Sequence, residues 1–467
     1  MDGIFEKRLR DFENCSVYNT VKKRESFKCK LRKKLGNKKK TLFRLKEFRL
    51  GEDEAQEKFE LDLYENLGRA NILETLSKSE RLITIHSIKH IISSPNPPIE
   101  QLINGGLIES LIPYTKSNSP LTCRCYILCI FSNILALSNQ TQLRFLEKHQ
   151  IIDLLFNNLS DYSQEIVENS LWGIANYAAN SENTCMLTLK NNFLGQVLII
   201  MKKFCSLEIL QIITWALTNI VHYESIINEK FLSKIFKICE KLLKFDFYVI
   251  KSEVFNIISI LIRKEDKKIE AFINCSLFNK VFYYWNQEIY KENLLKIVSN
   301  IAGGTHEQTQ FLLDLNILDL ILPLFHIDSQ EIQQSLYFFL SNIAAGTIEQ
   351  VKKLISHSVF QFILTSLDSE NFNIRTDCTY TLRNIVGVMR GCIEKEFFNN
   401  QLMQKLCSII KTHDPIIAIN CLHIFEEFII LYGKDEFTCR GYFEVIEKIM
   451  GFKNEEISGY CEKIFNM

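Results

Sequence analysis

The sequence is poor in the residues that make tight turns: its 467 positions include 17 glycines and seven prolines. A β-sandwich or barrel needs a turn every ten residues or so, so this scarcity argues against an all-β fold and favours long helices. Hydrophobic residues make up 47% and charged residues 24% of the chain, ordinary values for a soluble, well-packed protein. The composition therefore excludes collagen-like, mucin-like and wholly disordered chains.

The sequence also lacks the marks of a secreted or membrane protein. The start, residues 1–8, is charged and has no apolar core, so we expect no signal peptide. The longest uncharged run, residues 125–143, contains polar side chains such as Ser132 and Asn139, too many for a membrane span. The 15 cysteines are an odd number in a long chain, which favours free thiols in a reducing compartment. We expect a cytosolic or nuclear protein with no membrane contact.

Motifs of catalysis are missing as well. The sequence has no Walker-type glycine loop, no Gly-x-Ser-x-Gly and no His-Glu-x-x-His. His86 and His90 have metal-ligand spacing but no third ligand nearby, and the cysteines at 123, 125 and 129 do not form Cys-x-x-Cys. We therefore predict no enzyme, no metal site and no cofactor.

A net charge of zero conceals an uneven distribution. Residues 1–50 hold 17 Lys+Arg and six Asp+Glu, a net of +11, so the other 417 residues hold 38 basic and 49 acidic side chains, a net of −11. Such a basic arm suits nucleic acid, an acidic protein surface or the protein's own acidic body. Phe27, Leu31 and Leu35 share one helix face, so the arm can fold as an amphipathic helix on a partner. Its dense basic clusters are Lys22, Lys23 and Arg24; Arg32, Lys33 and Lys34; and Lys38, Lys39 and Lys40.

One motif recurs after residue 80: an Asn near the end of an apolar helix, preceded four positions earlier by a bulky residue. The pairs are Cys129/Asn133, Trp172/Asn176, Trp215/Asn219, Phe255/Ser259, Lys296/Asn300, Phe338/Asn342 and Tyr380/Asn384. Successive second members are 43, 43, 40, 41, 42 and 42 residues apart. This period is typical of helical solenoids of the HEAT or armadillo type, so we predict an all-α repeat array over residues 81–467, after a linker and entry helix at 51–80.

The pairs also predict a binding surface. Positions i and i+4 lie one above the other on a helix, so the pairs build two parallel ladders along one face. An Asn amide offers two donors and an acceptor, which match the backbone of an extended peptide, and spaced indoles form slots for lysine stems. Glu168, one turn before Trp172, would select positive charge. A single Trp-x-x-x-Asn is usually core packing, but a solenoid core does not require a recurring amide, so six in register favour peptide binding.

These residues resemble the importin-α family, the adaptors for basic nuclear localisation signals. Residues 97–108 look like the family's first repeat, and residues 214–219 and 299–310 are similar to its fourth and sixth. Lys296 fits, because that sixth repeat also has a basic residue in place of Trp. The arm, including Leu31, resembles the importin-β-binding segment, and residues 414–465 look like the repeats that contact the export receptor. The resemblance implies a right-handed superhelical armadillo solenoid of about ten repeats, the last ones degenerate, with a flexible basic N-terminal arm at 1–50.

The resemblance also implies two peptide sites, a shuttling protein of cytoplasm and nucleus, and partners that are proteins, with nucleic acid unlikely. Carried over by motif position, the major site comprises Asn133, Glu168, Trp172, Asn176, Asn180, Trp215 and Asn219. The minor site comprises Asn300, Phe338, Asn342, Asp377, Tyr380 and Asn384. The arm would fold on importin-β. When importin-β is absent, the arm would occupy the peptide surface and inhibit it.

The sequence departs from the family pattern at several of these positions. Cys129 replaces a Trp, Asn180 replaces an Asp that pairs with a key lysine, and Ser335 lacks an expected carboxylate. Phe338 and Tyr380 replace larger Trp rings. These departures predict an altered preference for basic cargo. The alternative interpretation is an armadillo scaffold without a transport role, whose basic arm binds nucleic acid or an acidic surface.

Overall fold

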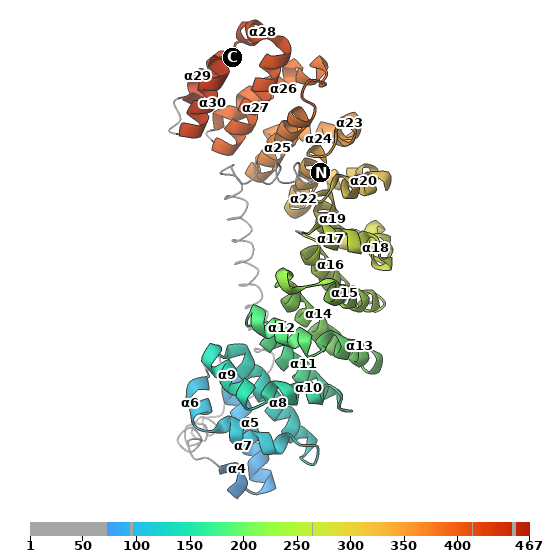
Figure 1. Ribbon diagram of the computed structural model, residues 1–467, viewed down its shortest axis with the longest axis vertical. Coiled ribbons are helices and arrows are strands. Elements are labelled where there is room, and N and C mark those ends of the chain that lie inside the picture. Colours follow the sequence, from blue (N-terminus) through green and yellow to red (C-terminus); the bar gives the residue numbers. More distant parts are fainter. Residues whose placement is uncertain (1–71, 94–96, 264, 413, 451–453) are drawn as a thin grey trace. The chain divides into compact units, whose positions relative to one another are not determined.

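The computed structural model of the chain describes residues 72–93, 97–263, 265–412, 414–450 and 454–467. Within these ranges every regular element is an α-helix or a short 3-10 helix (Figure 1). The all-α prediction is confirmed. The basic arm and the linker up to residue 71 lie outside the described residues, so the predictions made for them stay predictions.

Contacts divide the chain into two compact units, one up to Glu253 (unit 1) and one from Val254 (unit 2), with the boundary inside helix α16. In unit 1 the helices are α4 (Ile72–Thr75), α5 (Lys78–Ser93), α6 (Ile99–Asn104), α7 (Leu107–Leu111), α8 (Leu121–Leu137), α9 (Gln140–Lys148), α10 (Ile151–Asn158), α11 (Gln164–Ala178), α12 (Glu182–Lys190), α13 (Phe193–Lys203), α14 (Leu207–Val221) and α15 (Glu229–Leu242), followed by α16 (Tyr248–Leu261).

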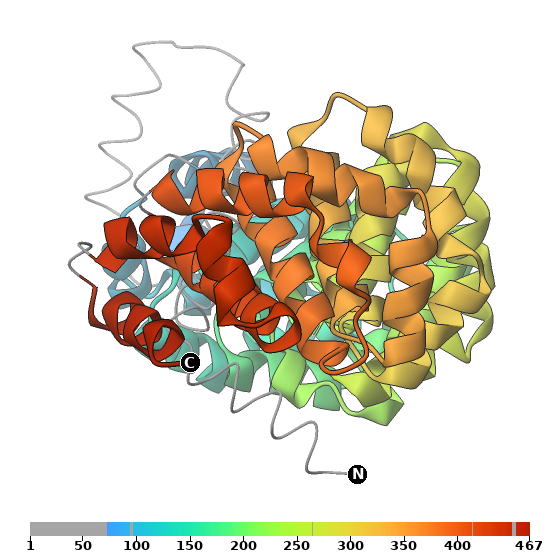
Figure 2. The same cartoon turned by 90° about the horizontal axis from the view of Figure 1, so that it is seen from above.

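Unit 2 continues the same pattern to the last described residue, and Figure 2 shows its helices side by side in successive layers. Its helices are α17 (Asp266–Ile273), α18 (Ser276–Phe282), α19 (Lys291–Ala302), α20 (His306–Asp314), α21 (Ile317–Ile321), α22 (Gln330–Ala344), α23 (Ile348–Ser356), α24 (Val359–Thr365), α25 (Phe372–Val388), α26 (Asn400–Ile409), α27 (Pro415–Tyr432), α28 (Lys434–Cys439), α29 (Tyr442–Met450) and α30 (Glu455–Phe465).

Most repeats consist of a short first helix, a second helix and a longer third helix, as in α9, α10 and α11. The first helix often begins with a capping box, in which the N-cap side chain and the third helical residue each accept a backbone N–H. Thr305 with Gln308 and Thr347 with Gln350 form such boxes. The amide nitrogens of both glutamines also donate to backbone carbonyls of the preceding repeat, each at 2.8 Å. Local helix starts are therefore coupled to the stacking of repeats.

The turn from first to second helix uses a left-handed residue at the same place in several repeats. Gly106, Gln150, Asn192 and Asn316 have φ angles of 78°, 57°, 56° and 53° and directly precede α7, α10, α13 and α21. Gly and Asn tolerate this conformation best, whereas a Gln there carries strain. The reversal brings the second helix back against the first, and the third helix then closes the layer.

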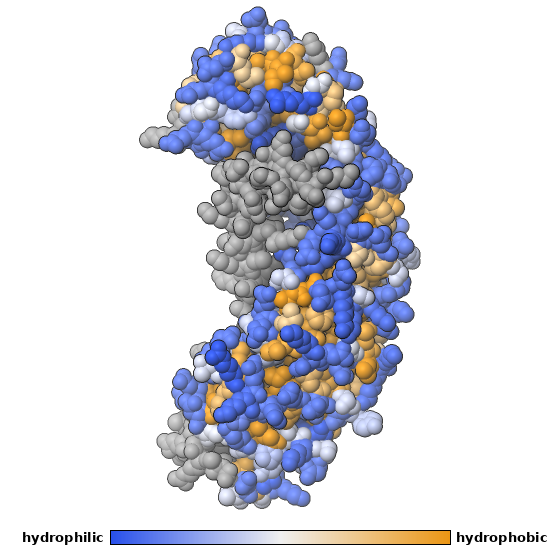
Figure 3. All heavy atoms as spheres, in the orientation of Figure 1, coloured by the Kyte–Doolittle hydropathy of each residue, from blue (hydrophilic) through white to orange (hydrophobic). Residues whose placement is uncertain are grey.

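The third helices form the inner contacts of each unit, where α8, α11 and α14 pack in series, as do α19, α22, α25 and α27. Most of their isoleucine and leucine side chains are almost fully buried, as are large rings such as Phe131 and Phe339. Helix α27 is long and apolar enough to cross a membrane by length and composition, but 67% of it is buried inside the protein, as in a core helix. The visible surface mixes hydrophobic with hydrophilic residues (Figure 3).

Candidate peptide-binding surface

All six predicted ladder asparagines lie on third helices. Asn133, Asn176 and Asn219 belong to α8, α11 and α14 of unit 1, and Asn300, Asn342 and Asn384 belong to α19, α22 and α25 of unit 2. We call these helices the ladder helices of each unit. Because consecutive ladder helices contact each other, the structure brings each set of three residues into one row.

Most of these amides form a hydrogen bond to the preceding repeat. The Nδ2 atoms of Asn300, Asn342 and Asn384 donate to the backbone oxygens of Ser259, Ser299 and Ser341, at 2.7, 3.0 and 3.1 Å. Asn176 does the same to Ser132 at 2.9 Å, and Asn133 donates to the Ser93 hydroxyl at 3.1 Å. A carbonyl oxygen has two lone pairs, so it accepts this bond beside its helical one. A recurring amide therefore has a structural use.

These amides differ in the hydrogen-bonding capacity that remains for a ligand. An Asn amide has two donors and an acceptor, so one bond leaves capacity for a peptide where the side chain is only half-buried. Asn133, Asn219, Asn300, Asn342 and Asn384 meet this condition. Asn176 is 2% exposed, so the expectation that all six amides face solvent is wrong for this residue. Asn219 differs again, because its buried Nδ2 atom has no hydrogen-bond partner.

The two indoles of unit 1 touch each other. The ring centroids of Trp172 and Trp215 lie 5.4 Å apart with the planes tilted by 35°. A methylene stem between two rings needs a separation of about 7 Å, twice the contact distance of carbon atoms. The predicted lysine slot between these two residues is therefore absent, and they present one continuous, half-buried aromatic surface.

The acidic residue beside this aromatic surface is held in place. Gln164 donates from its amide nitrogen to Glu168 at 2.7 Å and to the Ser206 hydroxyl at 2.9 Å. Burial raises the pKa of Glu168, the charges of Glu208 and Glu165 raise it further, and the bond from Gln164 opposes them. A cation placed beside this carboxylate would stabilise its ionised form, so the arrangement favours a positively charged ligand.

Asn180 is built into the structure as a donor. Its Nδ2 atom donates to the backbone oxygens of Asn176 at 2.9 Å and Leu135 at 3.1 Å. A carboxylate is an acceptor only and could not make either bond. The site of unit 1 thus has a neutral amide where a charge was expected from the resemblance.

The predicted minor site of unit 2 is more open and less acidic. Phe338 is 48% exposed, while Tyr380 and Asp377 are half-buried. Lys296 forms an ion pair with Glu292 one turn earlier, so its charge is compensated within α19. Ser335 adds no charge. The structure places Phe338 on ladder helix α22 and both Asp377 and Tyr380 on ladder helix α25.

A further ladder position escaped the sequence analysis. Glu426 on α27 stands 42 residues after Asn384, one period on, and the period alone would have found it. Its carboxylate accepts the Tyr460 hydroxyl at 2.6 Å and the Lys463 ammonium at 2.7 Å, both from α30. Burial raises the pKa of Glu426, but the two bonds prevail and hold it below the usual value. The row of unit 2 therefore ends in a carboxylate bound to the last helix.

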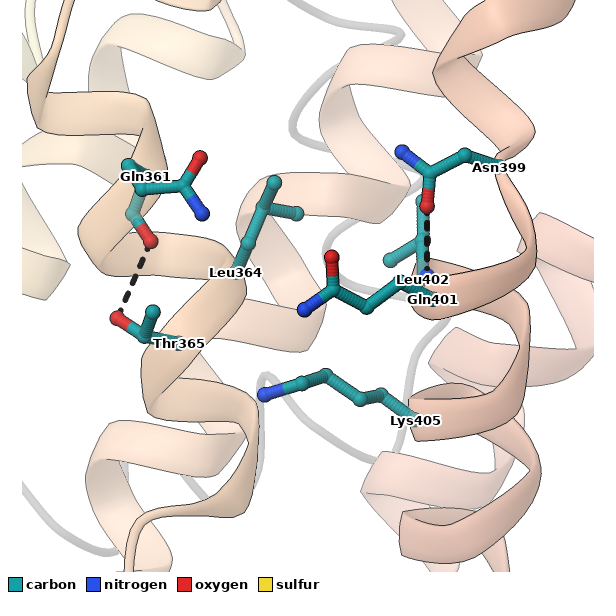
Figure 4. A pocket seen from close by; sticks show the side chains of 7 residues that line it. All are labelled: Gln361, Leu364, Thr365, Asn399, Gln401, Leu402 and Lys405. Atoms are coloured by element: carbon teal, nitrogen blue, oxygen red, sulfur yellow. Dashed lines mark hydrogen bonds between the residues drawn. The ribbon is translucent and has the colours of Figure 1, made fainter.

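A small pocket lies in unit 2 (Figure 4). It lies between α24 and α26 and is lined by Gln361, Leu364, Thr365, Asn399, Gln401, Leu402 and Lys405. Its volume is about 10 Å³, room for a single water molecule. Among the described residues no group of three or more His, Cys, Asp or Glu side chains is arranged to hold a metal ion.

Comparison with known proteins gives one informative sequence relative. No family model matches the chain. Importin subunit alpha-1b of Oryza sativa subsp. japonica is 21% identical over 254 residues, which are 54% of this chain and 46% of the relative. The chain therefore matches about half the length of this relative. The similarity points in the direction of the resemblance but is too distant to establish membership of the family.

Solved structures support the fold. An engineered protein superposes with a TM-score of 0.68 at 14% identity, over 86% of this chain and 98% of that chain. A chain from work on a phosphorylation switch that controls the interaction between cadherin and beta-catenin gives a TM-score of 0.59 at 12% identity, over 87% and 82% of the two chains. A designed armadillo repeat protein in complex with the peptide (KR)4 aligns over 68% of this chain and 98% of that chain, at 16% identity and a TM-score of 0.35. The chain is an armadillo-repeat solenoid, a fold of repeat scaffolds and adaptors.

Proposed function

We propose that the protein is a nuclear import adaptor that binds an extended, lysine- and arginine-rich localisation signal along its ladder helices. The observation that carries the proposal is the pair of half-buried amides, Asn133 and Asn219, on the same helices as or next to the Trp172–Trp215 surface, with Glu168 at its margin. The amides suit a peptide backbone of any sequence, and the carboxylate suits a cationic side chain.

The contact between the indoles changes how such a peptide would lie. A lysine stem packs over the joint face of the two rings, with its ammonium directed to Glu168. This mode uses one broad aromatic platform where separate slots were expected. The distant similarity to an importin subunit supports the proposal.

The other partners follow from the same proposal. Residues 1–50, with their net charge of +11, would bind importin-β, and the C-terminal repeats would bind the export receptor, so the protein would shuttle between cytoplasm and nucleus. When importin-β is absent, the tethered arm competes for the ladder surface at an effective concentration on the order of millimolar.

The test is a titration of the full chain with a labelled lysine-rich peptide and with a matched peptide in which serine replaces every lysine. The proposal expects the lysine peptide to bind at least about tenfold more tightly, Glu168→Gln to reduce that preference, and importin-β to raise peptide affinity. Tyr283→Ala serves as the control, because this ring is 76% exposed and lies away from the ladder helices. Equal affinity for the two peptides would refute the adaptor proposal.

A scaffold that binds peptides without a preference for lysine is the second candidate. It is favoured by the neutral Asn180 amide, held by two carbonyls, and by Lys296 and Ser335 in unit 2, which leave few free carboxylates at the ladder. In the same titration this scaffold would bind both peptides alike and would still lose affinity when Trp215 is replaced by alanine.

A further inference from the structure

A second charged surface lies on helix α15 of unit 1 and the turn that follows it. Five lysines, Lys230, Lys234, Lys237, Lys241 and Lys244, are spaced by four, three, four and three residues, so they share one face. Over this span the helix rises about 21 Å. The first, third and fifth lysines are exposed and the other two are half-buried. We call this row the lysine track.

The lysine track carries an excess of positive charge, since Glu229 and Glu240 are the only two carboxylates on α15. Among the described residues no ion pair joins any of the five ammonium groups to a carboxylate, and the one hydrogen bond, from Lys234 to the Asn192 side chain at 2.9 Å, is to a neutral amide. Other long basic side chains do form ion pairs, as Lys463 does with Glu426 and Arg390 with Glu427. Like charges three and four residues apart disfavour the free helix, so a multivalent anion is the ligand that relieves the strain.

The neighbouring helix α13 widens this surface. Helices α13 and α15 pack together, and the bond between Asn192 and Lys234 joins positions 42 residues apart, one repeat period. Lys202 and Lys244 each lie ten residues further along, so they stand level on adjacent helices, and both are exposed. The basic surface is therefore two helices wide at this end.

Exposed aromatic rings lie at the same end. Lys203 follows Lys202 and places its ammonium 4.5 Å from the ring centre of Tyr162, a side chain that is 92% exposed. Tyr248, four residues after Lys244, is 50% exposed. Nearby carboxylates are engaged, because Asp161 pairs with Arg124 and Asp246 with Lys251.

We propose that the lysine track, with Lys202, binds the phosphate backbone of a single-stranded nucleic acid whose bases stack on Tyr162 and Tyr248. Lysine ammonium groups act as point charges that suit phosphate, and aromatic platforms beside a basic track are the usual means of binding single strands without sequence preference. A membrane surface needs an apolar face to insert, whereas the exposed side chains of α15 are all polar: Glu229, Lys230, Ser233 and Lys237. The track lies on other helices than the ladder residues, so it works independently of peptide binding.

The test uses the full chain and fluorescein-labelled oligouridine and oligothymidine 15-mers, with anisotropy measured over a range of salt concentrations. The track variant combines Lys230→Gln, Lys237→Gln and Lys244→Gln. The matched control combines Lys148→Gln, Lys267→Gln and Lys352→Gln, which remove the same charge from exposed positions on α9, α17 and α23. The basic arm is present in both, so its contribution cancels.

We expect the track variant to bind at least about tenfold more weakly than the control at physiological salt. The slope of log K against log salt should fall by about 2, since each lost phosphate contact on a single strand contributes about 0.7. Tyr162→Ala with Tyr248→Ala should weaken binding with the slope unchanged, because stacking releases no counterions. Circular dichroism checks that each variant is folded, and lysine-peptide binding should remain as in the parent chain, which separates this proposal from the adaptor function.

Three results would overturn the proposal. Equal losses in the track and control variants would mean that only overall charge matters. A track-dependent loss of binding to phosphatidylserine vesicles, with the oligonucleotides unaffected, would assign the surface to membranes. A track-dependent loss of binding to a polyglutamate peptide, with the oligonucleotides unaffected, would assign the surface to an acidic protein.

Discussion

The two units present the same ladder with different chemistry beside it. In unit 1 the aromatic residues before Asn176 and Asn219 are tryptophans in mutual contact, and Glu168 lies one turn from the first of them. In unit 2 the corresponding residues before Asn300 and Asn342 are Lys296, paired with Glu292, and Phe338, which stands exposed.

This difference separates the residues that stabilise repeat stacking from those that would bind a ligand. The ladder amide is kept in both units, because it joins each third helix to the preceding one by a hydrogen bond. The aromatic and acidic neighbours are not required for stacking, and they are concentrated in unit 1. Unit 1 is therefore the stronger peptide site, and the following predictions test that ranking.

The largest effect is expected from removing the paired indoles. Buried aromatic anchors contribute about 2 kcal/mol or more each, so Trp172→Ala with Trp215→Ala should weaken lysine-peptide binding by a factor on the order of several hundred. The matched pair in unit 2, Phe338→Ala with Tyr380→Ala, should change it less than about tenfold. Isothermal titration with a peptide long enough for one unit gives both numbers. A larger loss from the unit 2 pair would reverse the ranking.

The second prediction concerns how the stability of unit 2 depends on pH. The Tyr460 hydroxyl lies 2.5 Å from Nδ1 of His423 and donates to Glu426, so the neutral imidazole carries its proton on Nδ1. Burial, helped by the nearby charges of Arg383 and Lys463 and opposed by that of Glu426, lowers the pKa of His423 to about 3. The unfolded chain binds a proton near pH 6.5 and the folded chain does not, so stability is full above that pH and is lost as pH falls towards 3.

Between pH 6.5 and 5 this linkage should cost unit 2 about 2 kcal/mol, at about 1.4 kcal/mol per pH unit. The protein has three tryptophans, and Trp285 is the one in unit 2, so a Trp172→Phe, Trp215→Phe background reports unit 2 by fluorescence. His423→Leu in that background should flatten the dependence over this range. An unchanged slope would mean that another group is responsible.

The sequence predicted the fold well, because the information lies in a long repeat. Seven pairs of a bulky and a polar residue, spaced by 40 to 43 residues, predicted one motif helix in each repeat, and the structure has these helices at Leu121–Leu137, Gln164–Ala178 and each later step. The unit boundary inside α16 was not predictable, since it follows from contacts between distant segments.

The site was predicted less completely, for two physical reasons. Spacing shows that residues share a face, but it does not show how deep they lie, so Asn176 was expected at the surface although it is buried. Nor does it give the distance between residues of neighbouring helices, so the contact of Trp172 with Trp215 could not be foreseen. The expectation that the repeat has no structural use for a recurring amide was wrong, because a carbonyl of the preceding repeat accepts its hydrogen bond.

The third prediction compares two amides within unit 1. Asn176→Ala removes a buried bond to Ser132 and leaves a small cavity, so it should lower the free energy of unfolding by about 1–2 kcal/mol. Asn219→Ala removes an amide whose buried nitrogen has no partner, so stability should change by less than about 0.5 kcal/mol. Urea titrations followed by circular dichroism measure both. Equal losses of unfolding free energy would show that the hydrogen bond from Asn176 to Ser132 contributes nothing beyond packing.

The smallest effect is expected on the lysine track. Lys237 has Lys234 three residues before it and Lys241 four residues after it, so Lys237→Glu turns two repulsive pairs into attractive ones, each pair changing by about 0.2–0.5 kcal/mol in either direction. The same change makes one attractive pair repulsive, because Glu240 lies three residues after Lys237, so the net gain is that of one pair. The melting temperature of unit 1 should therefore rise by about 1 °C or more. In unit 2, Lys352 lies three residues after Glu349, so Lys352→Glu creates a repulsive pair and should lower the melting temperature slightly. Differential scanning calorimetry at low salt measures both shifts, and high salt should abolish them. If Lys237→Glu stabilises α15 and also weakens oligonucleotide binding, the lysines are kept at a cost to the stability of the helix. Melting-temperature shifts of the same sign in the two units would contradict the charge argument.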